Sequence, residues 1–225
     1  MSSRDSFKLA WAIYKRKRVI RDYFASYPIR KLEIGAGPIM HEGWLCTDNR
    51  PDASSMYMDV RESFPFQDNS FHYVYSEHMI EHITWNEGLF MVKECYRVME
   101  PNGMIRIATP NLTNILRLYN NSDDPIAEKY IRWVTDRYLG IDVYKASIVI
   151  NNAFRNWHHQ FLYDGDLLEM TLNKSGFTNV QRCLIGESSN ENLRGMEAHG
   201  KKVGNEEMVA FETIVYEGTC YKPNM

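Results

Sequence analysis

Short apolar runs alternate with longer amphipathic stretches along this chain of 225 residues. Short runs bounded by turn residues are typical of buried strands, and longer periodic stretches are typical of helices. The pattern predicts helices over residues 6–25, Trp85–Met99 and Gly165–Ser175. It predicts strands over the following segments: Leu32–Ile34, Trp44–Asp48, Met56–Asp59, His72–Tyr75, Met104–Ala108, Phe177–Leu184 and Met208–Glu217. Because strands and helices alternate, we expect an α/β domain with a mostly parallel sheet.

Three segments add to this simple alternation. Residues 111–160 contain helical patches rich in Tyr, Trp and Asn, and we interpret them as an insertion over one end of the sheet. Residues 186–204 form a long polar loop between two predicted strands, and such loops are often functional. The helix over residues 6–25 combines aromatic and basic side chains. It fits a helix packed on the domain with a solvated cationic side, a lid over an anionic ligand, or a contact with a membrane surface.

The composition narrows the class of protein. Hydrophobic residues make up 44% of the chain and aromatic residues 13%, which is enough for a sizeable core, and the length favours one domain over residues 1–225. A formal net charge of −3 does not favour a nucleic-acid partner. The four cysteines match no metal-binding spacing, and we find neither a secretory signal nor an apolar run of about 18 residues. We therefore expect a cytoplasmic protein without a transmembrane segment, and a homodimer is left open.

Glycines and acids gather where the predicted strands end, which is where open α/β sheets bind their ligands. Gly35 and Gly37 follow the first strand, and glycine lets the backbone approach a ligand closely. Asp48 ends the second strand and Asp59 the third, where a carboxylate can accept hydrogen bonds from ribose hydroxyls or from an exocyclic amino group. The run Ser-Glu-His at residues 76–78 follows the fourth strand. This arrangement favours a nucleoside-binding site.

Several longer motifs resemble those of class I S-adenosylmethionine-dependent methyltransferases, and most of all the bacterial methyltransferase-11-like branch. These motifs cover nearly the whole chain and lie at residues 32–37, 75–82, 94–103, 105–111, 157–164 and 174–177. The resemblance implies a Rossmann-like, seven-stranded, mostly parallel sheet with an antiparallel last strand, helices on both faces and a helical insertion after strand five. Residues 1–28 would then be an N-terminal helical lid, and residues 111–160 an insertion that caps the substrate.

The resemblance also implies S-adenosylmethionine as the cofactor and assigns residues to it. The residues that match the family's cofactor motifs are Glu33, Gly35, Ala36, Gly37, Asp48, Asp59, Val60 and Ser76. The spacing between the glycine loop and the acid after the second strand is shorter than in nucleotide-binding folds in general. Asp48 follows Gly37 by 11 residues rather than by about 20. The short crossover over Pro38–Gly43 leaves little room for a helix, which argues against a dinucleotide site that aims a helix N-terminus at a pyrophosphate.

Histidines supply the candidate catalytic groups. We favour His159 as a general base that faces the pocket, with His78 as the alternative base and Glu77 as an orienting acid. In an extended segment the adjacent His158 and His159 would point to opposite sides, so we expect only one of them to face the pocket. The residues Asn152, Arg155, Trp157 and His158 are candidates for substrate binding.

A metal site is the competing interpretation of these histidines. Residues 78–82 fit the pattern H-x-x-E-H, in which two imidazoles and a glutamate serve a zinc ion. The pattern follows a parallel strand here, where the family keeps a Glu-His pair, so we expect no metal.

We therefore expect a methyltransferase that acts on a small polar acceptor, most simply by O-methylation of a sugar or sugar-like molecule. The alternatives left open are N-methylation of a small amine or amino sugar, and a non-catalytic scaffold that binds the cofactor.

Overall fold

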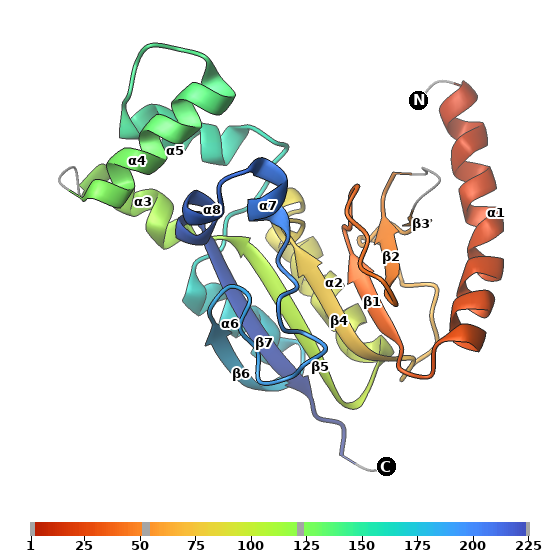
Figure 1. Ribbon diagram of the computed structural model, residues 1–225. Coiled ribbons are helices and arrows are strands. Elements are labelled where there is room, and N and C mark those ends of the chain that lie inside the picture. Colours follow the sequence, from red (N-terminus) through yellow and green to blue (C-terminus); the bar gives the residue numbers. More distant parts are fainter. Residues whose placement is uncertain (1–2, 51–54, 121–123, 224–225) are drawn as a thin grey trace.

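The computed structural model describes residues 3–50, 55–120 and 124–223. Within these ranges, seven strands form one sheet in the order β3-β2-β1-β4-β5-β7-β6, and β7 runs antiparallel to both of its neighbours (Figure 1). The remaining pairs are parallel. The strands are β1 Lys31–Ile34, β2 Leu45–Asp48, β3 Met56–Tyr57, β4 Phe71–Glu77, β5 Met99–Pro110, β6 Phe177–Cys183 and β7 Thr213–Cys220.

The helices frame the sheet and extend beyond its carboxyl end (Figure 1). They are α1 Ser3–Ser26, α2 Trp85–Val98, α3 Leu112–Asn120, α4 Pro125–Val134, α5 Ala146–Arg155, α6 Gly165–Lys174, α7 His199–Val203 and α8 Glu206–Glu212. A 3₁₀ turn covers Ile80–His82, and a π-helical turn covers Thr135–Leu139. Side-chain capping explains where some of the helices begin. The side chains of Thr84, Asp124 and Asp164 cap the N-termini of α2, α4 and α6. No helix in the described ranges has both the length and the apolar character that crossing a membrane requires.

The expected fold class is confirmed, and one predicted strand begins too early. Residues Met208–Glu212 belong to α8, whose start is capped by the Asn205 side chain, and the strand begins only at Thr213. Met208 and Phe211 pack against the helical insertion, so their apolar pattern serves a helix. Short apolar runs do not distinguish a buried strand from a buried helix. The polar loop over residues 186–204 likewise contains α7.

The two faces of the sheet are covered differently. On one face, Leu32, Val74 and Ile105 pack with α2 and α6 in the main apolar cluster, which Tyr23 of α1 joins at the sheet edge. The other face carries Tyr75, which packs with the buried side chains of Trp44, Cys46, Leu193 and Met196. The segment 184–198 covers this second face (Figure 1), so the layer of helices expected on both faces is present on only one of them.

A buried arginine ties that segment to the sheet. Arg106 of β5 is fully buried, and its guanidinium donates to Glu197 and Glu217, both at 2.6 Å. It also donates to the backbone oxygens of Glu187 and Leu184 at 2.9 and 3.2 Å. Burial lowers the pKa of Arg106, but the two carboxylates outweigh it and hold the pKa above its ordinary value. The segment is therefore fixed by charge and hydrogen bonding as well as by apolar contact.

The expected insertion is a helical unit with an apolar cluster of its own. Ile115 of α3, Tyr130 of α4 and Val149 of α5 pack together with Phe211 of α8. Residues 121–123 lie outside the described ranges. The unit lies beyond the carboxyl ends of the strands (Figure 1). In contrast, α1 packs along β3, at the edge of the sheet.

Replacing Arg106 with Gln should destabilise the fold by about 3–5 kcal/mol, because two buried carboxylates lose their cation. Thermal unfolding followed by circular dichroism would measure the loss. Arg132→Gln is the matched control, since its ion pair with Glu128 is exposed and such pairs contribute little. Equal melting temperatures for the two variants would contradict the role given to Arg106.

Candidate active site

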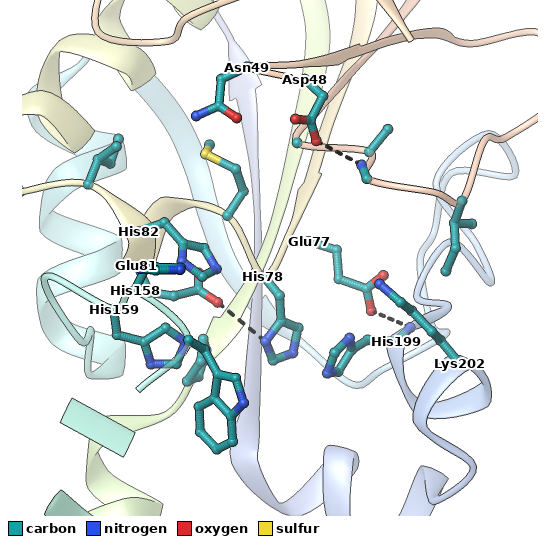
Figure 2. Close-up of a pocket in the computed structure, with 18 of the residues that line it drawn as sticks. Asp48, Asn49, Glu77, His78, Glu81, His82, His158, His159, His199 and Lys202 are labelled. Carbon is teal, nitrogen blue, oxygen red and sulfur yellow. Dashed lines mark hydrogen bonds and ion pairs between the residues drawn. The ribbon is translucent and has the colours of Figure 1, made fainter. Parts of the chain in front are cut away.

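A cavity of about 920 Å³ opens at the carboxyl ends of β1, β2 and β4. Its volume lies in the upper part of the range usual for small-molecule sites. Figure 2 shows Asp48 and Asn49 at one end, with His82, His158 and His159 on one side and His199 and Lys202 on the other. The insertion supplies an aromatic part of the wall through Tyr130, Trp133, Tyr138 and, just after α5, Trp157.

The glycine loop has the form that the sequence predicted. Gly35 has a φ of +74°, and a Cβ at this position would lie 2.3 Å from Cγ of Met79. Gly35 and Ala36 both donate their backbone N–H to the oxygen of Thr47, at 2.9 and 3.0 Å. Gly37 has a φ of +58° and donates its backbone N–H to a carboxylate oxygen of Asp48 at 3.0 Å. The loop is thus attached to the end of β2, and one face of it is exposed to the cavity.

Glu33 lies beneath this loop and is almost completely buried. Its carboxylate contacts Nδ1 of His41 at 2.9 Å and accepts from the Cys46 thiol at 3.0 Å. The hydrogen bond that Glu33 accepts from His41 raises the pKa of His41, and burial opposes it only in part. Burial together with the Glu33 charge raises the pKa of Cys46, so this thiol stays protonated. Glu33 therefore holds the short crossover after β1 in place.

The other carboxylates expected to bind the cofactor also line the cavity. Asp48 has a second oxygen that accepts the backbone N–H of Arg50 at 2.9 Å. Asp59 accepts a bidentate pair of hydrogen bonds from the Arg61 guanidinium at 2.9 and 2.6 Å. These bonds lower the pKa of Asp59, although burial raises it. Val60 lines the same wall. Ser76 is an exception, because its side chain is buried and does not line the cavity.

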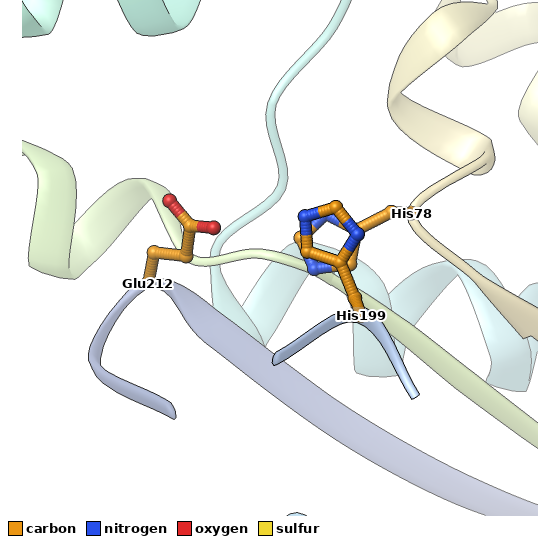
Figure 3. Close-up of side chains that lie close together, drawn as sticks. All are labelled: His78, His199 and Glu212. Atoms are coloured by element: carbon orange, nitrogen blue, oxygen red, sulfur yellow. The ribbon is translucent and has the colours of Figure 1, made fainter. Parts of the chain in front are cut away.

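Glu77 orients a loop and holds no imidazole directly. Its two carboxylate oxygens accept the backbone N–H groups of Ala198 and His199, each at 3.0 Å. These bonds fix the start of α7 and bring the His199 ring over His78, with ring centres 4.2 Å apart and planes inclined by 26°. Figure 3 shows the two rings stacked beside Glu212.

The two stacked histidines differ in protonation, because the pKa of His78 is raised and that of His199 is lowered. His78 contacts Thr213 Oγ1 through Nε2 at 3.1 Å and Glu81 through Nδ1 at 3.3 Å. Burial lowers the pKa of His78, but the charges of Glu81, Glu212 and Glu77 outweigh it and raise the pKa above its ordinary value. Burial and the nearby His78 and Lys202 lower the pKa of His199 to about 3. His78 thus favours the protonated form and has both nitrogens engaged, which makes it a poor base.

His159 has the geometry of a base. Its Nδ1 lies 2.7 Å from the backbone oxygen of Ala153, so the ring donates there and Nε2 keeps its lone pair. Burial lowers the pKa of His159, and the charges of His82 and His78 add to this effect against the opposing charge of Glu81. The ring is therefore neutral near neutral pH, with Nε2 available.

Backbone hydrogen bonds position His159. The N–H groups of Gln160 and Phe161 donate to the oxygen of Glu81 at 2.8 and 3.1 Å. The Gln160 side chain donates to the oxygen of His82 at 2.7 Å. These bonds attach the segment after the insertion to the turn that follows β4, and so bring His159 beside His82.

The backbone at residues 157–158 differs from the expectation. Trp157 and His158 have φ values of +56° and +66°, so the segment is not extended, and both His158 and His159 line the cavity. The expectation that only one of the two histidines faces the pocket is therefore wrong. Asn152 is buried and Arg155 is exposed, and neither lines the cavity. The described side chains of α1 do not line it either.

Some cavity residues were not identified from the sequence. His41 lies in the short crossover, His199 in the polar loop, and Glu212 in the segment taken for a strand. The only sequence signal was the unusual length of the 186–204 loop, which contains His199; His41 and Glu212 had none, because their neighbours in space are far away along the chain.

A family model and one solved structure support the interpretation of the fold. Residues 43–107 match the family model described as "Methyltransferase domain". A chain of the structure titled "Complex between the Haloferax volcanii Trm112 methyltransferase activator and the putative methyltransferase" matches with a TM-score of 0.51 and 13% identity over 100% of both chains. A SAM-dependent methyltransferase from Archaeoglobus fulgidus matches with a TM-score of 0.49 and 16% identity over 94% of both chains. No curated protein matches the chain in sequence.

The fold and the glycine loop define a Rossmann-like nucleoside-binding domain. Residues 43–107 match a methyltransferase domain, and the fold around them is that of the class I S-adenosylmethionine-dependent methyltransferases, which use S-adenosylmethionine as their cofactor.

Replacing Gly35 with Ala should weaken S-adenosylmethionine binding at least about tenfold, because Met79 or the loop must move to admit the Cβ. Isothermal titration calorimetry would measure the affinity. Gly195→Ala is the control, since Gly195 also has a positive φ but no atom lies within 4 Å of its Cβ position. Unchanged affinity in the folded Gly35→Ala variant would contradict the role given to the loop.

The His41–Glu33 contact predicts a pH dependence of stability. Because the folded-state pKa of His41 is raised, the contribution of this pair is complete below the unfolded-state pKa of about 6.5. It is lost as the pH rises through the folded-state value. Urea unfolding of the parent and of His41→Asn should therefore show a larger difference in stability at pH 6 than at pH 8.5. A difference independent of pH would contradict the charged pair.

Proposed function

We propose that the protein transfers the methyl group to a hydroxyl of a small polar acceptor, such as a sugar or a sugar-like molecule, and that His159 accepts the hydroxyl proton. The observation that carries this proposal is the orientation of His159. Its Nδ1 is engaged by Ala153, which leaves Nε2 on the cavity side as the proton acceptor. A neutral imidazole with one free nitrogen suits general base catalysis near neutral pH.

The proposed cofactor pose follows the line of the strand ends. The 35–37 loop, with Glu33 beneath it, would hold the aminocarboxypropyl end of S-adenosylmethionine. Asp48 would accept the ribose hydroxyls, and Asp59 with the Val60 backbone would contact the adenine. The methyl group then faces the turn after β4, where the histidines gather. Alignment and exclusion of water are the main contributions that a protein makes to such an in-line displacement.

The acceptor end of the cavity supports a hydroxylated ligand. Trp133, Tyr138 and Trp157 offer aromatic faces to a ring, and His158 offers polar contact. The Trp157 and Tyr138 rings pack at 5.1 Å and hold this wall in place. Residues 111–160 thus cap the acceptor in the proposed complex. An amine acceptor attacks through its own lone pair and has less need of the His159 base.

A cytoplasmic location is part of the proposal. The four cysteines are unpaired, which suits a reducing compartment.

The proposal is tested with a panel of hydroxylated and amine acceptors and S-adenosylmethionine that carries a labelled methyl group, with products identified by mass spectrometry. On a hydroxylated acceptor, His159→Ala should lower kcat by about 10²–10⁴-fold and leave the Kd for S-adenosylmethionine unchanged. His72→Asn is the control, because His72 lies on β4 outside the cavity. Full turnover by His159→Ala, or products methylated only on nitrogen, would overturn the proposal.

A further inference from the structure

We propose that Glu81, His82 and His159 bind a divalent cation such as Zn²⁺ or Mn²⁺ at the acceptor end of the cavity. Each residue offers one ligand atom, and these atoms lie within 4.8 Å of one another. All three residues line the cavity, and Figure 2 shows them together on one side of it. Ligand bonds of about 2.0–2.2 Å would draw the three atoms closer together by small side-chain rotations.

The state of Glu81 is the first argument for a cation. This side chain is completely buried, and its Oε2 accepts a hydrogen bond from Thr109 at 3.1 Å. Its Oε1 is buried and forms an ion pair with Nδ1 of His78 at 3.3 Å, but it accepts no hydrogen bond of good geometry. A long contact of this kind compensates a buried carboxylate oxygen only in part, and a cation bound at Oε1 would compensate it more fully.

The orientation of His159 is the second argument. A histidine that binds a metal through one nitrogen usually donates its other N–H to a carboxylate or a backbone carbonyl. His159 makes this bond to Ala153 and keeps Nε2 free. The His82 and His159 rings lie 5.1 Å apart and are inclined by 71°, so they do not stack face to face.

The backbone around the three ligands is already ordered. Gln160 and Phe161 donate to the Glu81 oxygen, and the Gln160 side chain donates to the His82 oxygen. These bonds join two segments that lie 78 residues apart at Gln160 and His82, and they set the distance between their side chains. A site held in this way needs little reorganisation when the cation binds.

The donor set favours particular cations. Two imidazoles and one carboxylate suit zinc, manganese and related transition metals, whereas magnesium and calcium prefer oxygen ligands. Three protein ligands leave coordination positions open toward the cavity, as in catalytic metal sites.

The role of the cation in catalysis rests on the proposed O-methylation. The acceptor hydroxyl binds to the cation, which lowers the pKa of that hydroxyl, and its proton is released to water. The oxygen then forms a bond to the methyl carbon while the bond from that carbon to sulfur breaks. The products are the methyl ether, S-adenosylhomocysteine and one proton. With the cation bound, Nε2 of His159 is a ligand, and the cation takes over the activation of the hydroxyl.

A second trio, His78, His199 and Glu212, also places ligand atoms within 4.8 Å of one another (Figure 3). Its donors are already engaged, since His78 contacts Thr213 and Glu81, and Glu212 accepts from the Tyr130 hydroxyl. The two rings stack face to face, which separates their in-plane lone pairs. This trio therefore serves as the internal control for the first.

The test uses full-length, tag-free protein stripped with a chelator and then titrated with ZnCl₂ and with MnCl₂ by isothermal titration calorimetry. We expect one cation per chain and at least tenfold weaker binding in Glu81→Gln, His82→Asn and His159→Ala, with His199→Gln unchanged. Circular dichroism confirms that each variant is folded. Absence of binding by either cation, or binding equally strong in all folded variants, would overturn the inference, as would loss of binding only in His199→Gln.

A turnover assay separates this inference from the proposed function. Turnover on a hydroxylated acceptor that is lost with EDTA and restored by Zn²⁺ or Mn²⁺ supports O-methylation and the catalytic cation, and it makes His159 a metal ligand in place of the base. Turnover that depends on His159 and is unaffected by EDTA overturns the catalytic cation and leaves the proposed function standing. Tight cation binding with methylation only of amines supports the site and overturns the proposed function.

Discussion

The hydrogen bonds that Gln160 and Phe161 donate to the backbone oxygen of Glu81 determine how the acceptor end of the cavity is built. They attach the chain that leaves the insertion to the turn that leaves β4. Together with the bond from the Gln160 side chain to the oxygen of His82, they fix the position of His159 relative to Glu81. The cavity therefore depends on a backbone contact between segments that are distant in sequence, and the side chains of the site follow from it.

A second contact of the same kind closes the opposite wall. Glu77 ends β4 and binds the N–H groups at the start of α7, which places His199 over His78. The buried Arg106 network supports this loop from below by holding Glu197 against the sheet. The end of one strand thus organises both walls, because Glu77 holds one loop and Glu81, four residues later, holds the other.

Features that depend on short-range pattern could be predicted from the sequence. The strands from Leu32 to Ile107 follow from apolar runs between turn residues, and the Gly35–Gly37 loop follows from glycines after a strand. Features that depend on residues distant in the sequence could not be predicted in this way. Met208 and Phe211 are helical because they pack on the insertion. The positive φ values at Trp157 and His158 place both His158 and His159 on the cavity, where an extended segment would have turned them to opposite sides. The H-x-x-E-H pattern at residues 78–82 contains two of the three residues in the proposed metal site, but its third partner, His159, is visible only in the fold.

The charges around the cavity also bear on a cationic sulfonium. The cluster at its centre contains three carboxylates, Glu77, Glu81 and Glu212, and burial raises the pKa of Glu212 despite the opposing charge of His78. The carboxylates favour the protonated form of His78, while His159 and His199 are held neutral. A positive sulfonium near this cluster therefore meets the positive charges of His78 and Lys202 together with several carboxylates. A cation bound at Glu81 would use one of these carboxylates, and Glu77 would remain as a negative charge near the sulfonium of the proposed complex.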